Sequence, residues 1–117
     1  MVFGSPGGDC QDQWALQFLL NVLEFGMSLQ EAVEAPTFWT GHFPNSFYPR
    51  KADPGSLHIE GRVAKSVQDA LSGRGHKVHE EKNWAGGNTL AASIHPRSRI
   101  RCAAASPRLE PACAFGF

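Results

Sequence analysis

A glycine-rich turn near the start of the chain constrains its fold more than any other stretch. Residues 4–9 read GSPGGD; they follow the apolar pair Val2 and Phe3 and precede a segment with helical periodicity. This order predicts a strand, a tight turn and a helix. Glycine lets backbone N–H groups approach a ligand closely, and a helix start adds unpaired N–H donors with partial positive charge. The turn therefore predicts a site for an anion, either bound or formed transiently in acyl transfer, unless it is only a tight connection.

The segment after the turn predicts two helices. Between residues 12 and 25, apolar residues recur at the spacing of one helix face, at Trp14, Ala15, Phe18, Leu19, Val22 and Leu23. Such a stripe is typical of a largely buried helix, and Gly26 is expected to end it. Ser28 and Glu31 form the Ser-x-x-Glu pattern of a capping box, which predicts a second, short helix. Pro36 ends that helix, because the residue before a proline is disfavoured in the α region.

The rest of the chain alternates between strand and helix patterns. Strands are expected over residues 37–40, 57–60 and 77–81, a helix over 62–72, and a β-hairpin over 89–95 and 100–105. The helix is expected to bury an apolar stripe made by Val63, Val67, Ala70 and Leu71. The run of alanines at 103–105 predicts a strand packed closely on both faces. These elements together indicate an α+β fold or a layered α/β piece.

Three prolines at 44, 49 and 54 rule out a regular element between residues 41 and 55. This loop carries Phe43, Phe47 and Tyr48. Two interpretations remain open: the aromatic rings hold the loop against the body of the protein, or they line the mouth of a substrate site.

Composition limits the class of protein. A chain of 117 residues forms one domain or part of a larger one, and its apolar fraction of 42% is enough for a core. Eleven basic and eleven acidic residues give no net charge, which gives no support to nucleic-acid or anionic-membrane binding. The sequence has no apolar run of 18 residues and no signal-peptide pattern, so no membrane span is predicted. The three cysteines and five histidines lack metal-ligand spacing, so free thiols and no metal or cofactor are expected.

The sequence offers no convincing nucleophile. No serine lies in a Gly-x-Ser-x-Gly elbow; Ser5 comes nearest but Pro6 follows it. None of the three threonines begins the chain. Cys10 lies at the predicted helix start, where a lowered pKa is expected, yet no histidine is placed beside it. Asp9 stands where a phosphate-binding loop needs lysine, so a polyanion site is disfavoured.

Several motifs in order resemble the C-terminal part of the gamma-glutamyltransferase family. They are the glycine turn, the leucine-rich segment after it, FGM at 25–27, QEAVEAP at 30–36, GRGHKV at 73–78 and AASPR at 104–108. The loop HFPNSFYPR at 42–50 is similar to the bacterial amidohydrolase-type branch, which includes oxamate amidohydrolase-like members. The resemblance spans nearly all 117 residues.

The resemblance implies the fold of an N-terminal-nucleophile hydrolase, an αββα sandwich with two sheets between helix layers. In that family a precursor cleaves itself and exposes a threonine at the start of the small subunit. This threonine attacks a γ-glutamyl or similar amide, with its own amine as base, and the acyl group then passes to water or an amino acid. The positions that donate backbone N–H groups to the oxyanion match Gly7 and Gly8 here.

By the same resemblance, residues 1–117 are expected to be the C-terminal portion of the small catalytic subunit, with its N-terminal part missing. The expected partners are the remainder of that subunit, the large subunit and a small amide or γ-glutamyl substrate related to glutathione. The nucleophile and the substrate-gripping residues would lie upstream of Met1, so neither the substrate contacts nor the localisation is predicted. This chain reads Ala35-Pro36-Thr37 where many members have Ala-Pro-Arg, and Ser106-Pro107-Arg108 where some have Asp-Pro-Arg. A stand-alone anion-binding module and a truncated structural piece that needs a partner chain remain the alternatives.

Overall fold

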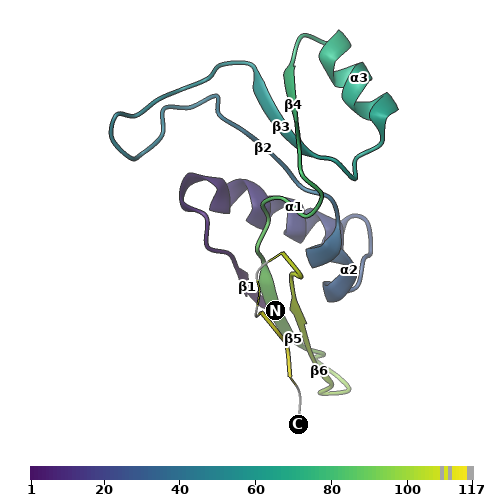
Figure 1. Cartoon of the computed structure of the whole chain (residues 1–117). Coiled ribbons are helices and arrows are strands. Elements are labelled where there is room, and N and C mark those ends of the chain that lie inside the picture. Colours follow the sequence, from purple (N-terminus) through teal and green to yellow (C-terminus); the bar gives the residue numbers. More distant parts are fainter. Residues whose placement is uncertain (109, 111, 116–117) are drawn as a thin grey trace. The chain divides into compact units, whose positions relative to one another are not determined.

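The computed structural model describes residues 1–108, 110 and 112–115. In this part of the chain it has three α-helices and two three-stranded sheets (Figure 1), which confirms the predicted α+β class. Contacts within the chain divide it into two compact units: Met1–Ala35 with Gly87–Phe117, and Pro36–Gly86. Among the described residues, no helix has both the length and the apolarity needed to cross a membrane.

The first unit combines two helices with an antiparallel sheet. Its elements are β1 (Val2–Gly4), the 3-10 turn η1 (Gly8–Cys10), α1 (Gln11–Leu23), α2 (Leu29–Glu34), β5 (Leu90–Ile94) and β6 (Arg101–Ala105). The strand order is β1-β5-β6, so the predicted hairpin is confirmed and the N-terminal strand joins it. Phe3 in β1 lies opposite Ala91 in β5, which lies opposite Ala104 in β6.

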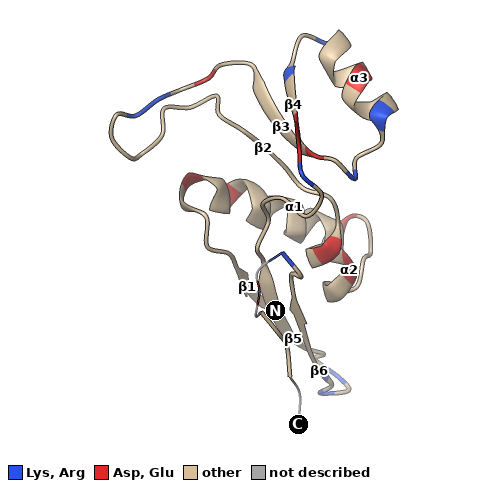
Figure 2. Cartoon of the chain, viewed as in Figure 1, with Lys and Arg blue, Asp and Glu red and all other residues tan. Residues whose placement is uncertain are grey.

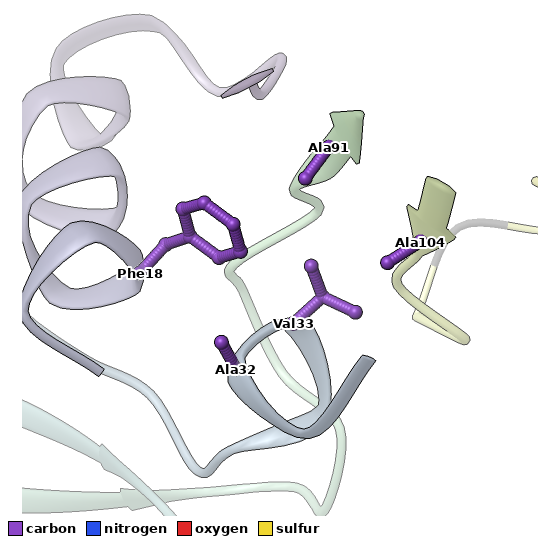
Figure 3. Packing of buried hydrophobic residues seen from close by; sticks show 5 residues of the cluster. All are labelled: Phe18, Ala32, Val33, Ala91 and Ala104. Carbon is purple, nitrogen blue, oxygen red and sulfur yellow. The ribbon is translucent and has the colours of Figure 1, made fainter. Parts of the chain in front are cut away.

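The core of this unit lies between the helices and one face of the sheet (Figure 3). Its buried members are Phe18, Ala32, Val33, Ala91 and Ala104. The alanines are small, which lets the helices approach the strands closely. Ala103 is exposed, so the prediction that the alanine strand packs on both faces is wrong. Side chains alternate along a strand, and only every second alanine points to the helices.

Both predicted helix boundaries in this unit have a visible cause. Gly26 adopts a φ of 67°, and the Met27 N–H donates to the Asn21 carbonyl at 3.0 Å, which closes the end of α1. The capping box at the start of α2 is confirmed: the Ser28 hydroxyl accepts from the Glu31 N–H, and the Glu31 carboxylate accepts from the Ser28 N–H at 2.8 Å.

Arg108 holds the end of α2. Its guanidinium donates to the carbonyls of Val33 at 2.6 Å, Ala35 at 2.8 Å and Glu34 at 3.4 Å. The last carbonyls of a helix lack partners inside the helix and carry partial negative charge, so a cation is stabilising there. The segment after β6 is thereby joined to α2.

The second unit contains a parallel strand pair with a helical connection. Its elements are β2 (Phe38–Thr40), β3 (Ser56–Glu60), α3 (Lys65–Gly73) and β4 (Lys77–Glu81). The order is β2-β3-β4; β2 and β3 are antiparallel, whereas β3 and β4 are parallel. All three strands were predicted, but α3 begins three residues later than expected. Gln68 is its buried residue, and Val67 is exposed, so the predicted apolar stripe of this helix is wrong.

Glu60 ties the two ends of the second unit together. Its side chain is fully buried, and its carboxylate accepts from the Thr37 N–H at 3.1 Å and the Trp84 N–H at 2.7 Å. It also pairs with Arg62, whose guanidinium lies 3.5 Å from the centre of the Trp84 ring. Thr37 is near the entry to the unit and Trp84 near its exit. A buried charge with these partners therefore fastens both connections.

The loop over residues 41–55 is irregular, as predicted. Phe43, Phe47 and Tyr48 are 87%, 64% and 95% exposed, so the prediction that they hold the loop against the body is wrong. Internal hydrogen bonds support the loop instead, including the one from the Asn45 N–H to the Lys51 carbonyl at 2.9 Å. A role at a substrate mouth stays a prediction.

The capping box gives a first testable prediction. Hydrogen bonds from the Ser28 backbone and side chain lower the pKa of the Glu31 carboxyl below its ordinary value. A lowered folded-state pKa means that this carboxylate stabilises the fold above its ordinary pKa, and that the contribution is lost as the pH falls through the lowered value. In an NMR titration we expect Ser28→Ala to move the Glu31 midpoint up toward the ordinary value. The control Ser66→Ala, in α3, should leave it unchanged; an unmoved midpoint in Ser28→Ala would contradict the assignment.

The buried interactions of the Glu60 carboxylate give a second prediction. Glu60→Ala leaves Arg62 and two backbone N–H groups without their buried acceptor, which should cost about 3–5 kcal/mol of local unfolding free energy. Hydrogen exchange at the amides of Thr37 and Trp84 measures this loss directly. Glu80→Ala, at an exposed carboxylate of β4, is the matched control and should change the protection by less than about 0.5 kcal/mol. Equal protection in both variants would show that Glu60 does not fasten the ends.

Candidate active site

The turn between β1 and α1 adopts a backbone that favours glycine at two successive positions. Gly7 has a φ of 140° and Gly8 a φ of 55°, both in the region that other residues rarely adopt. The Cys10 N–H donates to the Gly7 carbonyl at 3.2 Å, which begins η1 and leads into α1. Both glycines are exposed. Within the described residues, neither the Gly7 N–H nor the Gly8 N–H donates a hydrogen bond.

Trp14 occupies the space beside Gly7 where a side chain would otherwise lie. A Cβ atom built on Gly7 would come 2.3 Å from one atom of the Trp14 ring and 3.1 Å from two others. Trp14 is buried, with 8% of its surface exposed. Backbone conformation and steric contact therefore both exclude any residue but glycine at position 7.

Chemically, the turn offers two adjacent peptide donors at the start of a helix. Such donors suit an oxygen that carries or develops negative charge. Asp9 in η1 and Asp12 in the first turn of α1 place two acidic side chains nearby, at the start of α1 (Figure 2). These carboxylates oppose the binding of a polyanion such as a nucleotide phosphate, as expected from the sequence.

Cys10 is not an activated nucleophile. Burial raises the pKa of its thiol, and the nearby charge of Asp9 raises it further. The predicted lowering of this pKa is wrong, because desolvation and a like charge outweigh the field at the helix start. Cys10, Cys102 and Cys113 all carry free thiols.

Other polar groups are engaged in local contacts. The Ser5 hydroxyl donates to the Pro6 carbonyl at 2.6 Å. In the second unit, the His58 ring stacks on Trp39 and His79, and its Nδ1 lies 2.7 Å from Glu81 Oε1. Within residues 1–108, 110 and 112–115, no group of three or more His, Cys, Asp or Glu residues could hold a metal ion.

The structure thus brings Gly7 and Gly8 together with Trp14, whose place beside the turn the sequence did not reveal. Trp14 was predicted only as part of the apolar stripe of the helix. The stripe predicted which face of the helix is buried, but not that Trp14 packs on Gly7 rather than on the sheet. The role of Arg108 was also missed, although the Ser-Pro-Arg motif that contains it was singled out.

Comparison with known sequences identifies relatives of this chain. The family model described as gamma-glutamyltranspeptidase matches residues 1–115. The "Acylase ACY 1 proenzyme" of Pseudomonas sp. (strain V22) is 39% identical over 89 residues, which are 76% of this chain and 14% of that protein. The "Glutathione hydrolase proenzyme" of Bacillus subtilis (strain 168) is 35% identical over 77 residues, which are 66% of this chain and 11% of that protein. The chain therefore spans a small part of the relatives that it matches.

Solved structures agree with this relationship. LmbA2991T421A superposes with a TM-score of 0.86 at 43% identity, over 91% of this chain and 19% of the other. The T380A mutant of Helicobacter pylori gamma-glutamyltranspeptidase superposes with a TM-score of 0.74 at 27% identity, over 92% of this chain and 53% of the other. These matches confirm the predicted fold class and the predicted family resemblance. The chain belongs to the gamma-glutamyltranspeptidase family.

Proposed function

We propose that this chain is the C-terminal portion of the small catalytic subunit of an enzyme that cleaves an amide and transfers or hydrolyses its acyl group. Family membership and the names of two relatives, an acylase and a glutathione hydrolase, support amide chemistry. The aligned parts of the chain cover 14% and 11% of those two relatives, which supports a companion portion that completes the enzyme. That companion, comprising the rest of the small subunit and the large subunit, supplies the threonine nucleophile.

The observation that carries this proposal is the pair of backbone N–H groups of the exposed residues Gly7 and Gly8, which have no acceptor within the described residues. Preorganised donors of this kind stabilise the oxyanion of acyl transfer, and removal of one costs about 2.7–4 kcal/mol of transition-state stabilisation. The donors belong to the backbone, so they need no side-chain reorganisation during the reaction. Gly7 and Gly8 therefore act as the oxyanion hole.

In the proposed reaction, the threonine amine takes the hydroxyl proton while the oxygen attacks the substrate carbonyl. The carbonyl π electrons move to its oxygen, which accepts hydrogen bonds from Gly7 and Gly8. Collapse of this intermediate expels the amine, which takes the proton, and leaves an acyl-enzyme ester. Water or an amino acid then attacks the ester through a second oxyanion in the same place. No cofactor or metal is required for these steps.

The alternative of a truncated structural piece has one observation in its favour. On the sheet of the first unit, Val2 in β1 and Ile94 in β5 are 70% and 51% exposed, on the face away from the core. An apolar sheet face of this kind needs a covering layer. In the proposed enzyme the second sheet of the sandwich supplies that layer, so the observation is compatible with both interpretations.

Replacement of one glycine tests the proposed oxyanion hole. The chain is produced together with the companion portion that carries the threonine, and release of a chromogenic amine from γ-glutamyl and aliphatic acyl anilides is followed. Gly7→Ala keeps the backbone N–H but displaces it, because the added Cβ meets the Trp14 ring; kcat per folded active site should fall about 10²- to 10³-fold, with KM changed less than about threefold. Gly4→Ala, where an added Cβ has no atom within 4 Å, is the matched control and should keep native activity.

Two outcomes would contradict the proposal. Native kcat in Gly7→Ala would remove the oxyanion role of this turn. Turnover of either anilide by the isolated 117-residue chain would show that the chain holds its own nucleophile, whereas the proposal places the nucleophile in the companion portion.

A further inference from the structure

We propose that Trp14 is a positioning residue that sets the direction of the Gly7 and Gly8 N–H groups. The inference rests on the proposed oxyanion role of those groups and extends it to a side chain that touches no substrate. Trp14 acts through the backbone of Gly7, with which its ring is in direct contact.

The position of Trp14 in α1 directs its ring at the turn. Trp14 lies in the first turn of the helix Gln11–Leu23. Helical side chains point back toward the helix N-terminus, so a long side chain at this position covers the residues that precede the helix. The ring atoms near Gly7 belong to the six-membered part of the indole, the end farthest from the Trp14 backbone.

The contact limits how the turn can move. Glycine alone samples a wide range of φ and ψ, so a turn with two glycines is intrinsically loose. The Trp14 ring fills the volume into which the Gly7 Cα would otherwise shift, because the nearest ring atom lies only 2.3 Å from the ideal Cβ position. A buried ring is itself held by its neighbours, so the Trp14 ring restricts movement of the turn on that side.

The helix that carries Trp14 is anchored in the core of the first unit through Phe18. Phe18 lies one helical turn after Trp14, and its ring centre is 5.0 Å from that of Phe3 in β1. Phe3 immediately precedes the glycine turn of residues 4–9. The strand before the turn and the helix after it are therefore joined through Phe3 and Phe18, while Trp14 supports the turn between them. Rigid support of this kind keeps donors in the productive direction before substrate binds.

Loss of the Trp14 ring should weaken stabilisation of the transition state more than binding of the substrate in the ground state. A misdirected N–H group still permits substrate to bind through contacts elsewhere, but it stabilises the oxyanion less well. The expected signature is a lower kcat with little change in KM. A purely structural role of Trp14 would instead lower the amount of folded protein and leave the kcat of the folded fraction unchanged.

The test uses the chain assembled with its companion portion and the anilide assay described above. Trp14→Leu should lower kcat about 10- to 100-fold per folded active site, with KM changed less than about threefold. Trp14→Phe keeps an aromatic ring beside Gly7 and should retain most of the native kcat. Glu24→Ala, at the exposed C-terminal cap of the same helix, is the control and should match the native enzyme. Native kcat in Trp14→Leu would overturn the inference.

A second measurement covers the possibility that Trp14→Leu does not fold. In the folded Trp14→Phe variant, the smaller ring leaves part of the space beside Gly7 open, so the backbone N–H vectors of Gly7 and Gly8 should show lower NMR order parameters than in the native enzyme. Unchanged order parameters at Gly7 and Gly8 in Trp14→Phe would overturn the inference. The activity of Gly7→Ala separates the two proposals. Native activity in Gly7→Ala would overturn the oxyanion role itself. Loss of activity in Gly7→Ala together with native kcat in Trp14→Leu would overturn only the role of Trp14.

Discussion

The packing of Phe18 against the sheet of the first unit is the contact on which the glycine turn depends. Phe18 touches Phe3 on β1 and lies in the cluster with Ala91 and Ala104, so it fixes both the distance and the rotation of α1 relative to the strands. The turn bridges the strand and helix that this contact joins. With only a few residues between β1 and α1, the path of the turn follows once its two ends are fixed. The ring of Trp14 then limits the freedom that two glycines would leave.

Local patterns predicted the elements of this chain well. The helix α1, the capping box at Ser28 and the terminal hairpin each depend on residues a few positions apart, and all three are present. The predicted stripe of α1 is buried only in part: Trp14 and Phe18 are buried, whereas Leu23 is 66% exposed. What failed depends on contacts between distant residues. Glu60 meets Thr37 and Trp84 across 23 and 24 positions, and no periodicity marks a glutamate that will be fully buried. The helix α3 begins at Lys65, three residues later than predicted and shortly after Glu60 in the chain.

The candidate site shows the same division. The glycine pair was visible in the sequence, because only glycine adopts the required backbone cheaply, and the family resemblance assigned Gly7 and Gly8 a role. The pKa of Cys10 was predicted in the wrong direction, because the helix start is visible in the sequence whereas burial is not. Trp14 was recognised as a core residue, yet its place beside Gly7 follows from three-dimensional packing alone. The sequence therefore predicted the glycine pair, and the structure was needed to find the contact between Trp14 and Gly7.

The acidic residues beside the turn clarify what kind of anion the proposed site serves. Asp9 and Asp12 lower the positive potential at the start of α1, and each exposed charge contributes about 1 kcal/mol at 4 Å in water. A free anion, attracted chiefly by that potential, gains little here. An oxyanion formed on a tethered substrate accepts short, directed hydrogen bonds, and each such donor is worth about 2.7–4 kcal/mol. The hydrogen bonds from Gly7 and Gly8 outweigh the repulsion from the two carboxylates only when the geometry of the turn is held tightly. The proposed site therefore distinguishes a transition state from a resting anion through the rigidity of the turn rather than through its charge.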